Sequence, residues 1–139
     1  MSTRRLAREY ALQTLYYSDT GKFSKEDSTM FINSFYENFD EDTFAFCKYL
    51  AQGTIANMEK IDEILSSRAK NWSVERMSAV DRAILRMATY ELVFSADNAP
   101  IPAIIDEAIE LAKKYSTENS GKFINGLLDQ IKTERKNGN

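Results

Sequence analysis

The chain has 139 residues, of which 43% are hydrophobic and 28% charged, the size and composition of one globular domain rather than of a disordered segment. It contains no histidine and a single cysteine, Cys47, which excludes an intramolecular disulfide and a thiolate cluster and removes the commonest general base. No stretch is apolar for long enough to span a membrane or to form a signal-peptide core, so we expect a cytoplasmic protein.

The formal net charge of −3 is unevenly distributed. Residues 1–18 carry three arginines and one glutamate, whereas residues 19–63 carry ten acids against four bases. Residues 64–139 carry eleven bases against ten acids. A polyanion such as a nucleic acid would therefore be repelled by the middle segment and tolerated by the two ends.

Apolar residues recur at intervals of three and four, and alternating strand patterns are absent, so the sequence predicts an all-α protein. A first helix is expected over residues 3–18, with Arg5, Arg8 and Glu9 turned away from its apolar face. Ser24 is expected to begin a second helix, because acids follow it in the first turn. The buried face of that helix is predicted to be aromatic, formed by Phe31, Ile32, Phe35, Tyr36 and Phe39.

A long apolar seam from Phe44 to Leu65 predicts either one long helix or two helices with a break near Asn57. The helical pattern lapses around residues 70–73, where we expect Trp72 to plug the edge of the core. Ser78 and Asp81 resemble a capping box for a helix that reaches Ser95.

Pro100 and Pro102 place a loop over residues 97–102 and the next helix directly after it. A polar turn is expected over residues 116–121, followed by a last helix. Six to eight helices with short links indicate one compact domain over residues 1–139, of about seven helices, built either as a single bundle or as two small three-helix-type bundles packed together. The polar tail, residues 132–139, is expected to be frayed.

No group of residues has the pattern of a catalytic or metal site. Cys47 falls on the apolar seam, which is typical of ordinary core packing. Asp40, Glu41 and Asp42 stand together at a helix start, where acids are usually caps and dipole partners. The sequence therefore predicts a binding protein without cofactor or metal, not an enzyme.

Arg4, Arg5 and Arg8 open the first helix. Positive charge there opposes the helix dipole, and Arg4 and Arg8 are like charges one turn apart, so folding alone does not favour them. Arginine forks suit phosphates, which favours an anionic partner. The alternative is a frayed terminus that the arginines merely keep soluble.

A second candidate site lies at the start of the last helix, where Asn119, Lys122 and Phe123 follow one another closely. Backbone N–H groups at a helix start can hold a phosphate, and an aromatic ring can stack on an unpaired base. The alternative is that Phe123 belongs to the core and Ser120 is a cap. The sequence leaves open whether this segment shares a face with the N-terminal arginines.

Four motifs occur in order along the chain: RRLARE with ALQTLY (residues 4–16), VDRAILR with YEL (80–92), IP leading into DEAIELAK (101–113), and KFINGLLD (122–129). Together they resemble the NusB family of bacterial transcription antitermination factors, over essentially the whole chain. The resemblance implies an all-helical fold of two small bundles. It also implies a partner, the small-subunit ribosomal protein NusE, with which such proteins bind single-stranded boxA RNA.

In that family the pair joins elongating RNA polymerase and other Nus factors and suppresses termination in ribosomal RNA operons. Some members form homodimers that mask the RNA-binding face. Carried over by position, the resemblance implies RNA contacts by Arg4, Arg5, Arg8, Asn119, Lys122 and Phe123. It implies a partner surface on the central helix, with Glu75, Arg76 and Asp81. The arginine run is sparser than in many relatives, and the position of Asn119 is often acidic in them.

Three alternatives stay open at this point. A NusB-like domain also forms part of some ribosomal RNA cytosine methyltransferases, which carry a catalytic domain behind it. The chain could instead be a protein-only scaffold, which would show no salt-sensitive RNA binding. A hydrolase that uses the acidic cluster is disfavoured by the absence of histidine and of metal-ligand spacing.

Overall fold

The computed structural model describes residues 3–70, 72–97 and 99–135, and it divides into two compact units, Met1–Ala56 and Asn57–Asn139. All regular structure among these residues is helical, which confirms the all-α prediction. The first unit contains α1 (Thr3–Thr20), α2 (Lys25–Asn33) and α3 (Glu41–Ala56). The second contains α4 (Met58–Arg68), α5 (Ala79–Thr89), α6 (Ile101–Tyr115) and α7 (Glu118–Ile131). No helix in the described ranges is both long and apolar enough to cross a membrane.

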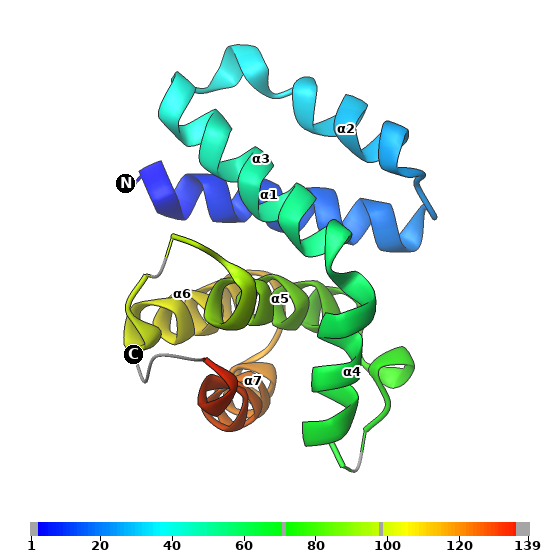
Figure 1. The fold of residues 1–139 in the computed structure, drawn as a ribbon, viewed down its shortest axis with the longest axis vertical. Coiled ribbons are helices and arrows are strands. Elements are labelled where there is room, and N and C mark those ends of the chain that lie inside the picture. The colour runs from blue at the N-terminus through cyan, green and yellow to red at the C-terminus, as the bar shows by residue number, and fades with distance from the viewer. Residues whose placement is uncertain (1–2, 71, 98, 136–139) are drawn as a thin grey trace. The chain divides into compact units, whose positions relative to one another are not determined.

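In the first unit, α1 packs against α2 and α3, and α3 crosses it in Figure 1. The predicted aromatic face of the second helix is only partly present. Since α2 ends at Asn33, Phe35 and Phe39 lie beyond it, and Tyr36 is exposed rather than buried. Phe35 and Phe39 form edge-to-face contacts with Tyr10, whose ring centroid is 4.9 Å from that of Phe35 and 4.6 Å from that of Phe39. Such pairs stabilise a fold beyond the area they bury. Ser24 begins α2 as expected, and it forms a reciprocal capping box with Asp27.

The acidic start of α3 is a cap, as the sequence predicts. The Asp40 carboxylate accepts a hydrogen bond of 2.8 Å from the backbone N–H of Thr43. This bond stabilises the ionised form and lowers the pKa of Asp40 from its ordinary value. Of the two possibilities for the apolar seam, the structure shows two helices, since α3 ends at Ala56 and α4 begins at Met58.

One expectation for α1 is wrong. Arg8 and Glu9 do not turn away from the packed face, since each is only 7% exposed. The long side chain of Arg8 lies beside Phe46 of α3, with its guanidinium carbon 5.4 Å from the ring centroid. Periodicity misses this because an arginine can bury its aliphatic stem and stack its flat head on an aromatic ring.

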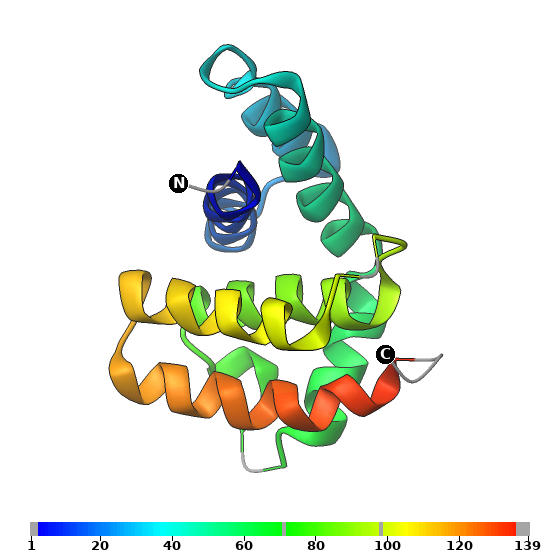
Figure 2. The ribbon, with the colours of Figure 1, turned by 90° about the vertical axis from the view of Figure 1, so that its left-hand side faces the viewer.

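The second unit is organised around α5, which contacts α4, α6 and α7. Its fully buried side chains include Ile84, Leu85 and Met87. On the side of α4, Arg86 donates two hydrogen bonds, of 2.9 and 2.8 Å, to the two carboxylate oxygens of Asp62. In Figure 2, α6 and α7 run antiparallel and side by side. This helical hairpin carries the start of α7, where the candidate site lies.

The helix expected from Ser78 to Ser95 changes geometry along its length. It is α-helical to Thr89, continues as a π-helical turn over Tyr90–Phe94, and ends at Ser95. The carbonyl groups near this turn are bound by the tail. The guanidinium of Arg135 donates to the carbonyls of Leu92 and Ala99, each at 2.8 Å, and to that of Glu91 at 3.2 Å. Residues 132–135 are thus held, whereas residues 136–139 lie outside the described residues and their fraying stays a prediction.

The position of Cys47 yields a test of the first unit. Burial raises the pKa of the Cys47 thiol to about 12, because a thiolate would lose its hydration there. Since the thiolate is the reactive form, we expect the native protein to resist a thiol-specific disulfide reagent at about pH 8 and to react fully once unfolded in urea. The absorbance of the coloured leaving group measures the extent of reaction of the folded and of the unfolded protein. Rapid reaction of the folded protein would contradict the burial.

Candidate nucleic-acid interface

The start of α7 presents the predicted residues on a helix rather than on a loop. Thr117 is the N-cap, and its hydroxyl accepts a hydrogen bond of 3.0 Å from the backbone N–H of Ser120. The polar turn expected over residues 116–121 therefore ends at Thr117, and Asn119, Lys122 and Phe123 lie in the first two turns of α7. A threonine cap satisfies the first helical N–H groups, which explains why the helix begins earlier than the hydrophobic pattern does.

Asp81 of α5 fixes the position of this helix start. Its two carboxylate oxygens accept hydrogen bonds from the hydroxyls of Ser116, at 2.9 Å, and Ser120, at 2.8 Å. The backbone N–H of Asp81 in turn donates to the hydroxyl of Ser78, the N-cap of α5, at 3.1 Å. Ser78 is the N-cap as predicted, but the Asp81 carboxylate binds Ser116 and Ser120 instead of completing a capping box. Asp81 is only 9% exposed.

Arg82 holds the neighbouring segment, the short helix η2 (Val74–Arg76). One terminal nitrogen of its guanidinium donates to the carbonyls of Val74, Glu75 and Met77, at 3.1, 3.3 and 2.9 Å. Val74 and Met77 are buried, so η2 is anchored at both ends, and Glu75 and Arg76 are left exposed between them. The predicted partner residues Glu75 and Arg76 are thus presented on a rigid turn.

A groove of about 310 Å³ separates η2 from the start of α7, and we call it the α5–α7 groove. Its lining residues are Trp72, Arg76, Met77, Ser78, Asp81, Asn119, Ser120 and Phe123. Two residues predicted to contact RNA and two predicted to contact a protein partner therefore line one groove. The sequence assigned these two pairs to separate surfaces, and only the tertiary fold brings them together.

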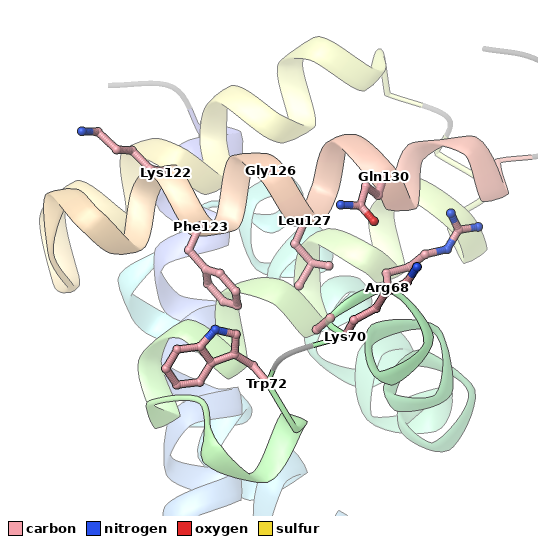
Figure 3. A pocket seen from close by; sticks show the side chains of 9 residues that line it. Arg68, Lys70, Trp72, Lys122, Phe123, Gly126, Leu127 and Gln130 are labelled. Carbon is pink, nitrogen blue, oxygen red and sulfur yellow. The ribbon is translucent and has the colours of Figure 1, made fainter.

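Trp72 does not plug the core, and that expectation is wrong. Its side chain is 54% exposed and stands edge-on to Phe123, with ring centroids 6.4 Å apart and an interplanar angle of 66°. Figure 3 shows the indole facing the phenyl ring from the segment that follows α4, while Phe123 points from α7. Sequence reasoning missed this pair. One signal in the sequence could have indicated its exposure: Trp72 lies outside the helical apolar pattern and has the polar neighbours Lys70 and Ser73.

The N-terminal arginines belong to the first unit, whereas Asn119, Lys122 and Phe123 belong to the second. Arg4 and Arg5 are exposed. The guanidinium carbon of Arg4 lies 3.8 Å from the centroid of the Phe46 ring, a cation–π contact that orients the charged group. Arg4 and Arg8 thus both contact the ring of Phe46.

The chemistry of these two clusters is that of binding. Their groups are guanidinium and ammonium cations, an amide and aromatic rings, which recognise phosphates and bases. In the described part of the chain, no group of three or more acidic or cysteine side chains is placed to hold a metal ion.

The role of Asp81 can be tested by Asp81→Ala. The substitution leaves two serine hydroxyls without their charged acceptor, and bonds to charged groups contribute about 1.5–3 kcal/mol, so we expect a loss of unfolding free energy in that range. Urea unfolding followed by circular dichroism measures it. As a matched control, Asp106→Ala removes an exposed acid of α6 and should change stability by less than about 0.5 kcal/mol. Equal effects of the two substitutions would refute the positioning role of Asp81.

Comparison with known proteins gives a consistent result. The family model described as the NusB family matches residues 5–133. The transcription antitermination protein NusB of Elusimicrobium minutum is 59% identical over 138 residues, covering 99% of both chains.

Two solved structures agree with the observed architecture. The structure of NusB from T. maritima superimposes with a TM-score of 0.86 at 40% identity, covering 95% of this chain and 92% of the other. A crystal structure of the antitermination factors NusB and NusE in complex with dsRNA matches with a TM-score of 0.80 at 29% identity, covering 96% and 98% of the two chains. The chain therefore belongs to the NusB family of transcription antitermination proteins.

Proposed function

We propose that this NusB-family antitermination protein binds single-stranded, boxA-type RNA together with NusE, and that it does so through the start of α7 and the exposed arginines of α1. The observation that carries the proposal is the groove-side placement of Asn119 and Phe123 next to exposed Lys122. An RNA complex of a relative with NusE supports the choice of both partners. In this role the protein joins RNA polymerase and other Nus factors in the bacterial cytoplasm.

Single-stranded RNA fits this groove better than a duplex does. Phe123 is half-buried, so its ring is anchored while one part stays accessible to a base. Bases can stack on such a ring only when they are unpaired, because a duplex hides their faces. Lys122, the residue before Phe123 on the helix, is exposed and supplies a cation for a neighbouring phosphate.

Asn119 adds a neutral polar group to the same turn. Its side chain is exposed and lines the α5–α7 groove. An amide can donate and accept hydrogen bonds with base edges, and it does not repel phosphate as a carboxylate would. Glu118 is the acid in this first turn, so a second acid at position 119 would weaken the attraction for RNA.

On the first unit, Arg4 and Arg5 are the groups proposed to reach phosphates, because both are exposed. Arg8 was also expected to contact RNA, but its side chain is buried, so we propose an indirect role for it. Packed beside Phe46, it contributes positive potential and supports the ring on which Arg4 stacks. Arg5 and Arg4 then approach the strand as bidentate forks.

For NusE we propose the exposed turn η2 with Glu75 and Arg76, which Arg82 holds in place. Asp81, on the same groove, acts as a positioning residue for the start of α7. Because Arg76 also lines the α5–α7 groove, RNA and partner would meet along one edge. From this arrangement we expect RNA and NusE to bind cooperatively. Of the alternatives, the methyltransferase module finds no support among the relatives described above, which are antitermination proteins.

A salt series on a labelled boxA-type RNA with NusE present tests the proposal. We expect the double variant Arg4→Ala with Arg5→Ala to flatten the log–log slope of affinity against salt by about 1.4, at about 0.7 per lost single-strand phosphate contact. Lys122→Gln should flatten it by about 0.7. Fluorescence anisotropy of the RNA gives the affinities.

The control is Lys25→Gln, which removes an exposed lysine from α2 of the same unit as the arginines. An unchanged slope in both the Arg4/Arg5 variant and Lys122→Gln, with NusE binding intact, would refute these residues as RNA contacts. A wild-type protein that shows no salt-sensitive RNA binding with NusE present would be a protein-only scaffold.

A further inference from the structure

We propose that Trp72 forms a second base-binding wall, so that one unpaired nucleotide of the RNA occupies a pocket between Trp72, Phe123 and Lys70. The pocket lies on the other side of the Trp72–Phe123 pair from the α5–α7 groove, and we call it the side pocket. Its volume is about 330 Å³, within the range of small-ligand sites. This inference rests on the proposed function, since it names the path of the same RNA beyond Phe123.

The side pocket has an aromatic end and a cationic end. Figure 3 shows Trp72 and Phe123 at one end, with Arg68, Lys70 and Gln130 at the other. Ala69, Gly126 and Leu127 complete the lining between them. A nucleotide has the same division, because its base presents a flat apolar face and its phosphate a negative charge.

The cationic end has one ammonium available for an anion. Arg68 is paired with the carboxylate of Glu134 on the tail. Lys70 is exposed, and no ion pair to it is formed within the described ranges. Gln130, exposed on α7, adds an amide that can hydrogen-bond a sugar or a base edge. Lys70 is therefore the group we assign to the phosphate.

The aromatic end is built to receive a ring. The backbone N–H of Trp72 donates to the carbonyl of Ala69, at 3.2 Å, which ties the tryptophan to the end of α4. Phe123 and Trp72 pack in an edge-to-face arrangement, and Trp72 remains 54% exposed, so its indole is accessible to a ligand. Exposed, anchored aromatic rings beside cations are the usual platform for unpaired bases. Continuity with the α5–α7 groove through Phe123 makes RNA the favoured occupant over an unrelated ligand.

The first test detects directly whether a ligand binds next to Trp72. Trp72 is the only tryptophan of the sequence, so the chain labelled with 5-fluorotryptophan gives a single fluorine resonance. We expect this resonance to shift when boxA-type RNA is added to the protein with NusE, and not when NusE alone is added. A shift caused by NusE alone, with none on adding RNA, would overturn the proposal and make Trp72 a protein contact.

The second test measures affinity by anisotropy of the labelled RNA. Trp72→Ala should weaken RNA binding about five- to a hundred-fold, the range for loss of one base–aromatic stack. Trp72→Phe keeps an aromatic ring and should retain most of the RNA affinity. Lys70→Gln should flatten the salt slope by about 0.7. Its matched control is Lys60→Gln, an exposed lysine of α4 that lines neither cavity.

A blocking variant separates the pocket from the fold. A Cβ added at Gly126 meets no atom within 4 Å, so a side chain fits there without disturbing α7. Gly126→Glu should fill the side pocket with bulk and negative charge and weaken RNA binding, while Gly126→Ala should not. Thermal unfolding checks that each variant is folded.

The outcomes distinguish the two proposals. If wild-type protein binds RNA with a salt-dependent affinity but Trp72→Ala and Gly126→Glu bind as tightly, the side pocket is refuted and the proposed function stands. If the wild-type protein with NusE binds no RNA, the proposed function is refuted, and the side pocket is refuted with it.

Discussion

The Asp81 carboxylate is the interaction on which the geometry of the second unit's binding surface depends. It accepts hydrogen bonds from two serines, Ser116 in the turn after α6 and Ser120 in the first turn of α7. A buried carboxylate without such donors would be costly, so the helix start cannot shift away from α5 without a large loss of stability. The next residue, Arg82, binds three carbonyls of the η2 segment. Two adjacent side chains, Asp81 and Arg82, therefore set both walls of the α5–α7 groove.

This arrangement gives the exposed residues rigid supports. Phe123 lies on the second turn of α7, and Arg76 lies on a turn whose flanking residues, Val74 and Met77, are buried. A binding residue that is already fixed loses less conformational freedom when its ligand arrives. The same principle applies to Arg4, whose guanidinium is oriented by the Phe46 ring before any RNA binds. Flexible basic tails lack this advantage, since they must be ordered at the moment of binding.

Hydrophobic periodicity predicted the helices well, because each helix buries one face and the spacing of three and four records that face. The helix starts at Ser24 and Ser78 were predicted from local capping signals. The break at Asn57 was one of two alternatives that the apolar seam left open. The start of α7 was placed too late, since Thr117 caps a first turn that has no apolar residue.

Contacts between elements distant in the sequence could not be predicted. The carboxylate of Asp81 reaches residues 35 and 39 positions further along the chain, which no local pattern encodes. Arg8 and Trp72 were misplaced for related reasons. Whether an amphipathic side chain is buried or exposed depends on which ring or surface lies opposite, as Phe46 does for Arg8 and Phe123 does for Trp72.

The charge of the whole molecule explains why such a protein would need local contacts and a partner. With a net charge of −3 and ten acids in residues 19–63, long-range attraction for RNA is weak. In the proposed function, affinity would then come from short-range contacts of arginine forks, aromatic rings and lysines. A weak general attraction combined with several specific contacts favours discrimination, since RNA lacking the right unpaired bases gains little from the charge alone.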